Sequence, residues 1–177
     1  MRRVNTTPYI HPVRMFLGID QSYTKLGICV LDADGELVHY NVFATDKTLD
    51  IYDRATEAAA FICSIVDDYK ISTIGIEGLA FGKFGNATRD LAGLLFTIIT
   101  SIRRVCTSVP AVHILAPTSI KKLATGSGKA GKQDMIDHLP KMVHHTFLQT
   151  HKKTTGLQDL ADAYWIAVAA KQNTDNK

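Results

Sequence analysis

Short apolar runs alternate with longer amphipathic segments along this chain of 177 residues. The runs are rich in Ile, Val, Leu and aromatic residues, which favour extended structure. They predict five strands, over 15–20, 26–32, 37–44, 72–77 and 111–116. Elsewhere apolar residues recur every three or four positions, as in an amphipathic helix. This spacing predicts long helices over 49–69, 86–106 and 157–171, a short helix after Pro117, and a helical stretch within 132–146.

The order of these elements predicts one α/β domain. The first three strands follow one another closely, and the Asp34-Gly35 turn between the second and third favours an antiparallel meander. The last two strands alternate with helices, which is typical of parallel strands. We therefore expect a five-stranded mixed sheet with helices on both faces. This domain spans 15–171, between a basic, flexible leader at 1–14 and a disordered tail at 172–177.

Composition excludes several classes of protein. A hydrophobic content of 46% at this length provides one sizeable core but not two. No apolar run reaches the roughly 18 residues of a membrane-spanning helix, and the leader lacks the apolar stretch of a secretory signal. The three cysteines are far apart in the sequence, which argues against a disulfide framework or a thiolate metal site. We expect a cytosolic or nuclear protein, without membrane contact, whose cysteines are buried thiols.

Carboxylates stand at the ends of two predicted strands and at the start of the last helix. Asp20 ends the first strand, Glu77 ends the fourth, and Asp159 and Asp162 begin the final helix. Residues three apart on a helix project to one side, so that pair can face one point. Singly, each acid has an ordinary role as a turn residue or a partner of the helix dipole, and Asp159 fits the latter better than Asp162. The joint pattern predicts that all four meet at one edge of the sheet.

Four carboxylates at one point repel one another unless cations lie between them. Hard oxygen ligands suit Mg²⁺ or Mn²⁺, and two such ions side by side activate water and stabilise the leaving oxygen in phosphodiester cleavage. We therefore predict a two-metal catalytic site formed by Asp20, Glu77, Asp159 and Asp162.

A basic segment follows the fifth strand. Residues 117–153 hold seven lysines and two aspartates, whereas 15–116 hold eight basic and twelve acidic residues. The lysines flank a glycine-rich loop at 125–132, where glycines let the backbone approach a phosphate. The loop lacks the spacing of a P-loop, so no nucleotide cofactor is expected. The segment predicts nucleic-acid backbone contacts through Lys121, Lys122, Lys129 and Lys132, with Lys132 or Lys121 also stabilising charge on the reacting phosphate.

Aromatic residues follow Glu77 directly. Phe81 and Phe84 lie in a glycine-bracketed loop where a core role is hard to arrange. Exposed aromatics beside an active site wedge into or stack on unpaired bases, so both are candidate DNA contacts, with loop anchoring as the alternative. Arg89, at the start of the next helix, is a candidate phosphate contact. The helix over 86–106 is apolar on more than one side, which predicts a partner surface.

Four segments in order resemble the signature regions of the RuvC Holliday-junction resolvases, which belong to the RNase H-like superfamily. The segments read GIDQSYTKLGICVLD, IGIEGLAFGK, APTSIKKLATGSGKAGKQDM and LQDLADAYWIAVAA. The similarity spans about 15–171 and is nearest the phage-encoded branch of the family. It implies an RNase H-like fold, a homodimer, and Mg²⁺-dependent cleavage of branched DNA during recombination and repair, in the host cytoplasm for a phage-encoded protein.

The resemblance also implies site residues. Its catalytic tetrad falls on the four acids named above, and its third region carries lysines near the scissile phosphate, here Lys121 and Lys132. Bacterial members often have Pro-Gly after the first aspartate, where this chain has Gln21-Ser22. That change alters a loop beside the substrate, so bacterial sequence preference does not carry over.

Three other functions compete with this interpretation. An actin-like phosphotransferase has a similar first hairpin, but it needs a second lobe for which 177 residues are too few. A non-catalytic branched-DNA-binding module would have no use for a repulsive cluster of four acids. An RNase H-like nuclease acting on RNA or an RNA–DNA hybrid stays open, because the catalytic layout does not identify the sugar.

Overall fold

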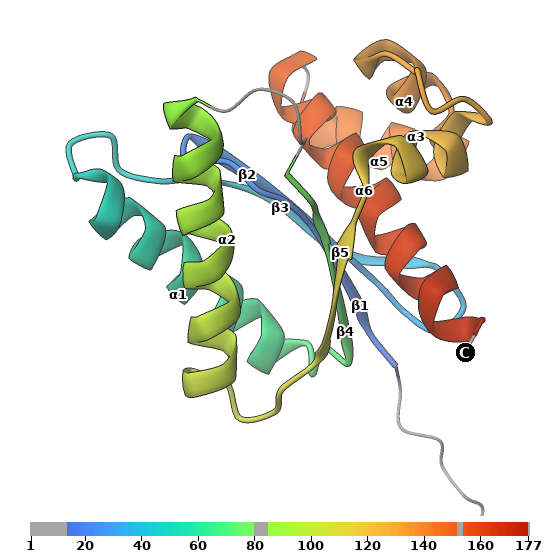
Figure 1. The fold of residues 1–177 in the computed structure, drawn as a ribbon. Helices are drawn as coiled ribbons and strands as arrows, with labels where there is room; N and C mark the ends of the chain where they lie inside the picture. Colours follow the sequence, from blue (N-terminus) through green and yellow to red (C-terminus); the bar gives the residue numbers. More distant parts are fainter. Residues whose placement is uncertain (1–13, 80–84, 152–153, 177) are drawn as a thin grey trace, which may run out of the picture.

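The computed structural model describes residues 14–79, 85–151 and 154–176. A five-stranded sheet in the order β3-β2-β1-β4-β5 forms its centre (Figure 1). β1 pairs antiparallel with β2, and β2 with β3, while β4 runs parallel to both β1 and β5. The predicted mixed sheet is confirmed. Its strands are β1 Phe16–Asp20, β2 Lys25–Leu31, β3 Leu37–Ala44, β4 Thr73–Glu77 and β5 Ala111–Leu115.

Helices cover both faces of this sheet, as Figure 1 shows. One face carries α1 Ile51–Asp68 and α2 Asn86–Val105. The other carries α3 Pro117–Thr125, α4 Lys132–Asp137, α5 Lys141–Thr150 and α6 Thr154–Asp175. In the part of the chain that the structure describes, none of the helices is both long and apolar enough to cross a bilayer.

Two predicted boundaries in the C-terminal part differ from the structure. The helical stretch expected within 132–146 is two helices, α4 and α5, because Pro140 has no N–H to donate and stands as the N-cap of α5. The final helix begins at Thr154 and continues to Asp175, so it starts earlier and ends later than the predicted 157–171. Asp175 holds this end through ion pairs with Lys171, 2.7 Å, and Arg14, 3.1 Å.

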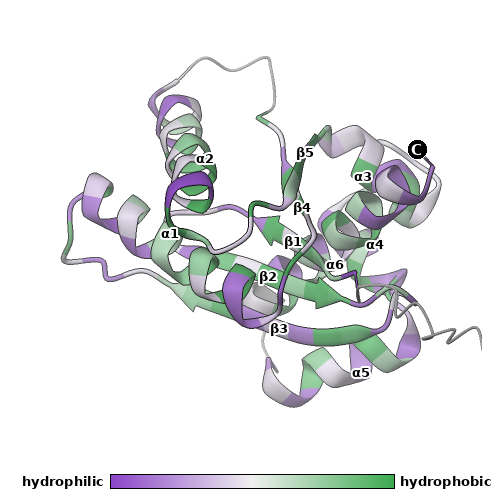
Figure 2. Cartoon of the chain, turned by 90° about the horizontal axis from the view of Figure 1, so that it is seen from below, coloured by the Kyte–Doolittle hydropathy of each residue, from purple (hydrophilic) through white to green (hydrophobic). Residues whose placement is uncertain are grey.

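The core lies in two layers, one on each side of the sheet. Under α1 and α2, side chains such as Ile19, Ile28 and Ile76 pack against Ile62 and Ile98. In the strands of this core, the side chains pointing to either face of the sheet are apolar, which fits central strands covered on both faces. Figure 2 shows the hydrophobic positions gathered where strands and helices face each other. Of the predicted buried thiols, Cys29 and Cys63 are buried and Cys106 is half-buried.

The second layer brings α6 into direct contact with the sheet. Gly18 of β1 makes this possible, because a Cβ at that position would lie 2.1 Å from the backbone oxygen of Ala163. Gly27 of β2 does the same further along, where a Cβ would lie 2.4 Å from the backbone oxygen of Asp159. Any larger residue at either strand position requires α6 to move away. The close approach sets the height at which the acids of α6 stand above the strand ends.

Candidate active site

The carboxylates of Asp20 and Glu77 lie side by side at the carboxyl ends of two neighbouring strands. The parallel register of β1 and β4 runs up to the residues just before them, so the two acids are neighbours. Gly18 and Gly75, two residues earlier on each strand, both face α6. Because alternate residues of a strand share one face, Asp20 and Glu77 also face α6.

The two remaining acids come from α6. Asp159 lies over Gly27 of β2, and Gly27 is the register partner of Asp20. Asp162 stands about one turn further on, on the same side of the helix. Since α6 begins at Thr154, its first turn holds no acidic residue, and Asp159 lies in the second turn. The helix-dipole role, which the sequence left open for Asp159, therefore does not account for it.

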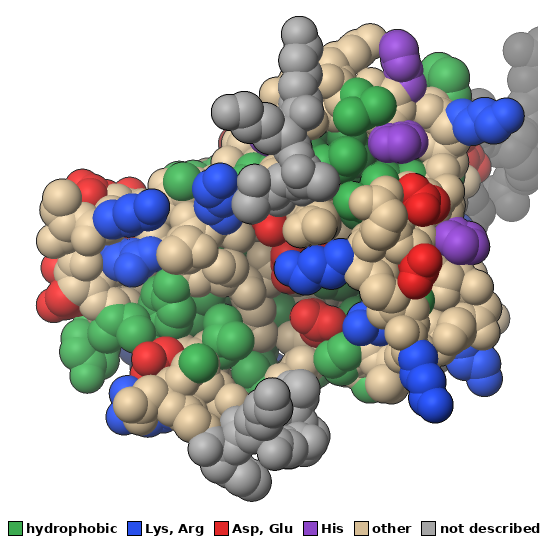
Figure 3. All heavy atoms as spheres, turned by 90° about the horizontal axis from the view of Figure 1, so that it is seen from above, with side chains coloured by type: hydrophobic (Ala, Val, Ile, Leu, Met, Phe, Trp, Pro, Cys, Tyr) green, Lys and Arg blue, Asp and Glu red, His purple; other side chains and the backbone are tan. Residues whose placement is uncertain are grey.

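The four carboxyl groups share one electrostatic environment. Burial raises the pKa of Asp20 well above its ordinary value of 3.8, and the charges of Asp162, Glu77 and Asp159 raise it further. Burial also raises the pKa of Glu77, with the charge of Asp162 as the next cause. The structure thus brings together the four acids predicted from the sequence. Figure 3 looks onto this end of the sheet and shows acidic side chains in the middle of the face, beside basic ones.

Asp162 is the most strongly perturbed acid of α6. Burial raises its pKa to about 6, although the positive charge of Lys132 acts in the opposite direction. Burial raises the pKa of Asp159 as well, again against nearby positive charges. A carboxyl group whose pKa rises in this way is destabilised in its charged form, and a bound cation removes that penalty.

Lys132 and Lys121 stand over these acids. Lys132 begins α4, directly after the glycine-rich loop, and its charge lowers the pKa of all four carboxyl groups. Lys121, on α3, acts in the same way on Glu77 and Asp162. Both lysines line a cavity of about 210 Å³ together with those two acids. The cavity provides one place where a negatively charged group meets both the acids and the lysines.

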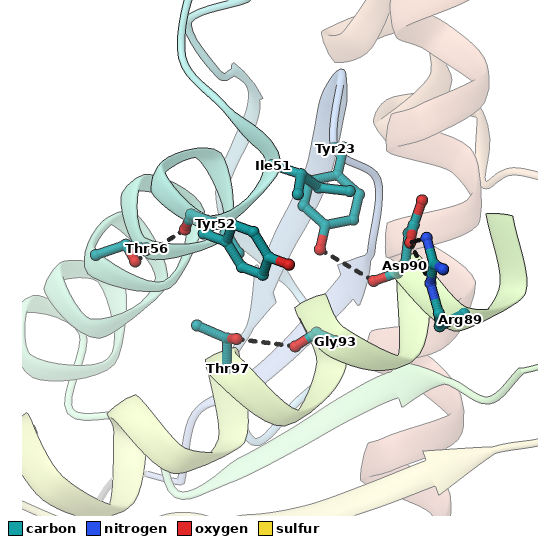
Figure 4. Close-up of a pocket in the computed structure, with 9 residues that line it drawn as sticks. Tyr23, Ile51, Tyr52, Thr56, Arg89, Asp90, Gly93 and Thr97 are labelled. Carbon is teal, nitrogen blue, oxygen red and sulfur yellow. Dashed lines mark hydrogen bonds and ion pairs between the residues drawn. The ribbon is translucent and has the colours of Figure 1, made fainter. Parts of the chain in front are cut away.

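The other predicted DNA contacts lie apart from this cavity or outside the described residues. Lys122 and Lys129 are both exposed and do not line the cavity. Arg89 is exposed on α2, forms an ion pair of 2.9 Å with Asp90, and borders a separate hollow between α1 and α2 (Figure 4). Phe81 and Phe84 fall within residues 80–84, which the structure does not describe.

A glutamine ties the two strand ends together, at the position where the sequence departs from the family pattern. The Nε2 of Gln21 donates a hydrogen bond of 3.0 Å to the backbone oxygen of Glu77. The register of β1 with β4 ends at Ile19 and Ile76, so this side chain supplies a connection beyond the ladder. Its Oε1 is buried without a hydrogen-bond partner among the described residues. No motif signals this role, because a glutamine at a strand end is an ordinary surface residue in most sequences.

The donor set fits a divalent cation. All four groups are carboxylates, the hard oxygen ligands that Mg²⁺ and Mn²⁺ prefer. One of them, Asp159, has a buried Oδ2 without a hydrogen-bond partner among the described residues, and such an atom is costly unless something binds it. No cluster of three or more acidic, histidine or cysteine side chains within the described ranges forms a ready-made ion shell. Binding of an ion by three or more of these carboxylates would therefore require their side chains to rotate.

A mixed sheet in this strand order, with acids at the carboxyl ends of β1 and β4 and on a helix packed across them, has the arrangement of an RNase H-like fold. The model of the family "Crossover junction endodeoxyribonuclease RuvC" matches residues 16–170. The chain belongs to this family. It is accordingly a crossover junction endodeoxyribonuclease, a hydrolase of phosphodiester bonds, and membership implies dependence on a divalent metal.

Individual relatives agree with this assignment. The RuvC of Pseudothermotoga lettingae is 29% identical over 124 residues, covering 68% of this chain and 75% of the relative. The solved structure of Thermus thermophilus RuvC superposes with a TM-score of 0.70 at 19% identity, covering 91% and 96% of the two chains. The same protein in complex with a Holliday junction substrate gives a TM-score of 0.68 at 20% identity, covering 92% and 96%. These two structures support the fold.

Proposed function

We propose that this protein resolves four-way DNA junctions by paired nicks, using two Mg²⁺ ions held by Asp20, Glu77, Asp159 and Asp162. One observation carries the proposal: three separate elements, β1, β4 and α6, deliver four acids into one electrostatic environment. That arrangement costs stability unless cations compensate it. Mn²⁺ has the same ligand preference and is expected to substitute.

Each part of the site has a separate role. When bound, the two ions would activate water and stabilise the leaving oxygen. The four carboxylates hold the ions, and the Gln21 hydrogen bond keeps the ends of β1 and β4 together. Lys132 lies close enough to all four acids to offset charge that develops on the phosphate, and Lys121 does so at Glu77 and Asp162.

The substrate is proposed from the family and from one relative. Thermus thermophilus RuvC, which shares the fold, has been solved with a Holliday junction. We propose the same branched DNA for this chain, contacted through the basic segment around α3 and α4, with Phe81 and Phe84 at the branch point. An enzyme of this kind acts where DNA is processed, so we propose a cytoplasmic location.

A substrate panel tests the function. Wild-type protein is incubated with a four-way junction, a linear duplex and an RNA–DNA hybrid, each in Mg²⁺ and in EDTA. We expect symmetric nicks in the junction only with Mg²⁺. Preferential cutting of the hybrid would establish the RNA-directed alternative. Binding to the junction without cleavage in Mg²⁺ or Mn²⁺ would establish the non-catalytic alternative.

Lys132→Ala tests the role of the lysine that begins α4. The expected result is a fall in kcat for junction cleavage of about 10²–10³-fold, the range for losing one preorganised group that stabilises transition-state charge. Because Lys132 lowers the pKa of all four acids, its loss should also move the pH profile of cleavage toward higher pH. Single-turnover rates between about pH 6 and pH 9 measure both effects.

The matched control for this variant is Lys141→Ala. Lys141 is an exposed lysine at the start of α5, and it borders a hollow beside the β2–β3 turn, at the other end of the sheet from the acids. Its loss should leave the rate and the pH profile as in the wild type. An unchanged pH profile in Lys132→Ala would contradict the electrostatic role given to that lysine.

We also propose that two copies pair through α2 and β5. Phe96 on α2 is 68% exposed and Ile114 on the edge strand β5 is 58% exposed. Ile114 is in register with Ile76, which packs into the core under α1 and α2, so Ile114 lies on the same side of the sheet as α2. Large apolar side chains exposed on neighbouring elements are typical of an interface.

Sedimentation of Phe96→Asp tests this pairing. A charge placed in the middle of an isologous interface appears twice and should convert the dimer to a monomer at micromolar concentration. Met142→Asp is the control, because Met142 on α5 is 79% exposed and lies on the opposite face of the sheet from α2. A wild-type protein that sediments as a monomer, or a Phe96→Asp variant that remains dimeric, would contradict the interface.

A further inference from the structure

Lys25 stands beside the acids on the side away from Lys121. It begins β2, whose residue Gly27 is covered by α6 at Asp159, with the absent Cβ only 2.4 Å from the Asp159 backbone oxygen. Alternate residues of a strand share a face, so the side chain of Lys25 leaves β2 on the α6 side. Lys25 itself is exposed, and within the described ranges it forms no ion pair.

The turn that presents Lys25 is well ordered by its own hydrogen bonds. The backbone N–H groups of Thr24 and Lys25 donate to the Oγ of Ser22, at 3.2 and 3.4 Å. The same turn follows Asp20 and Gln21, so its position is fixed relative to the metal-binding acids. These hydrogen bonds fix the backbone at Lys25, so its side chain starts from a defined place beside the acids.

His151 approaches the same acid from the end of α5. It packs against the first turn of α6, where a Cβ at Gly156 would lie 2.5 Å from His151 Cδ2. Its Nδ1 is within hydrogen-bond distance, 2.9 Å, of the Thr150 hydroxyl, which orients the ring. Burial raises the pKa of Asp159, whereas the charges of Lys25, Lys132 and His151 lower it. The charge of Lys121 instead lowers the pKa of Glu77 and Asp162.

Basic groups therefore lie on both sides of the acids, with Lys121 on one side and Lys25 with His151 on the other. A DNA strand carries a phosphate at every nucleotide, so a strand cut at the acids presents further phosphates in both directions. The predicted contacts Lys121, Lys122, Lys129 and Lys132 all belong to the α3–α4 side. They leave the strand unsupported on the opposite side.

We propose that Lys25 and His151 form a second phosphate-binding site, which holds the cleaved strand on the far side of the acids from Lys121. The ligand is a backbone phosphate of the cut strand, next to the scissile one or one nucleotide beyond. The inference rests on the proposed function, since it takes DNA as the substrate. Two-sided support fixes the direction of the strand through the acids, which one-sided contacts leave free.

Binding of a four-way junction in EDTA tests the site without relying on cleavage. Lys25→Ala should weaken binding about 5–10-fold near 0.1 M salt and reduce the slope of log K against log salt by about 1, the effect of losing one phosphate contact. Lys25→Arg retains the charge and should bind as the wild type does. Lys141→Ala, at the other end of the sheet, should also bind as the wild type does.

Junctions with a single neutral methylphosphonate linkage identify the phosphate. At one linkage beside the cut, neutralisation should weaken junction binding by the wild type but should not weaken binding by Lys25→Ala any further. Binding by His151→Gln should likewise be insensitive to neutralisation at the same linkage or at its neighbour. A salt slope unchanged in Lys25→Ala, or an equal loss at every linkage, would overturn the proposal, because the lysine would then act only as a diffuse charge. Cleavage of the unmodified junction by wild type tests the proposed function separately.

Discussion

Asp162→Asn is expected to slow cleavage of a four-way junction by about 10³-fold or more while leaving junction binding intact. A metal ion stabilises the charge of a phosphoryl transition state by several kcal/mol, and each 1.36 kcal/mol is about a factor of ten in rate. Asn has the shape of Asp but lacks the negative charge that holds the ion. Single-turnover cleavage in saturating Mg²⁺, together with binding in EDTA, separates the two effects.

Asp175→Asn is the matched control for this substitution. Asp175 lies near the end of the same helix and pairs with Lys171 and with Arg14, which precedes the start of β1, at the opposite end of that strand from Asp20. Cleavage by this variant should proceed at the wild-type rate. If Asp162→Asn retained full cleavage, the carboxylate of Asp162 would not hold a metal, and the assignment of the site would be wrong.

The raised pKa of Asp162 leads to a second prediction, which concerns the pH dependence of folding stability in the absence of metal. The pKa of Asp162 rises from 3.8 to about 6 on folding, chiefly through burial. A raised pKa contributes stability that is fully present below the unfolded value and is lost as the pH rises through the folded value. Wild type should therefore lose stability between about pH 4 and pH 6 relative to Asp162→Asn, which does not titrate.

The expected size of this difference is about 3 kcal/mol, the free energy that corresponds to a shift of that magnitude. Chemical denaturation in EDTA should find Asp162→Asn more stable than wild type by this order at about pH 7.5 and equal to it near pH 4. Saturating Mg²⁺ should reverse the order at the higher pH, because the metal binds the folded wild type more tightly.

Asp175→Asn should behave in the opposite sense. A hydrogen bond from Lys171 lowers the pKa of Asp175, so its contribution is present above the unfolded value and is lost as the pH falls. A wild type that matches Asp162→Asn in stability at both ends of this pH range would contradict the repulsive, buried site described above.

The sequence predicts the fold well where a pattern is compatible with a single structure. The apolar runs that end in Asp20 and Glu77 are strands buried on both faces, and their order leaves little choice of topology. The boundaries it misplaces depend on single residues. Pro140 divides one helical pattern into two helices, and the pairing of Lys171 with Asp175 extends α6 beyond its apolar stripe.

The acids are predictable for a similar reason, since a carboxylate at the end of a buried strand is costly unless something binds it. The detailed arrangement is not predictable, because it depends on contacts between distant segments. The direct packing of α6 on Gly18 and Gly27 decides which way Asp20 faces and puts Lys25 beside Asp159. The sequence around a lysine at the start of a strand does not indicate that Asp159 lies next to it.

The roles of the individual lysines in the basic segment could also not be predicted from the sequence pattern alone. Periodicity and charge identify it as a cluster of lysines, but only the fold separates them. Lys121 and Lys132 line the cavity with the acids, whereas Lys122 and Lys129 lie outside it. The family resemblance singled out the same two lysines from their place in the third signature region.

Anomalous diffraction from crystals grown with Mn²⁺ and a four-way junction tests the metal-binding site most directly. Lys132→Ala protein, in which the acids are intact and cleavage is expected to be slow, is suited to these crystals. Two anomalous peaks are expected among Asp20, Glu77, Asp159 and Asp162, next to one phosphate of the junction. A bound junction with no peak at these carboxylates, or with the ions held by other residues, would contradict a two-metal site formed by the four acids.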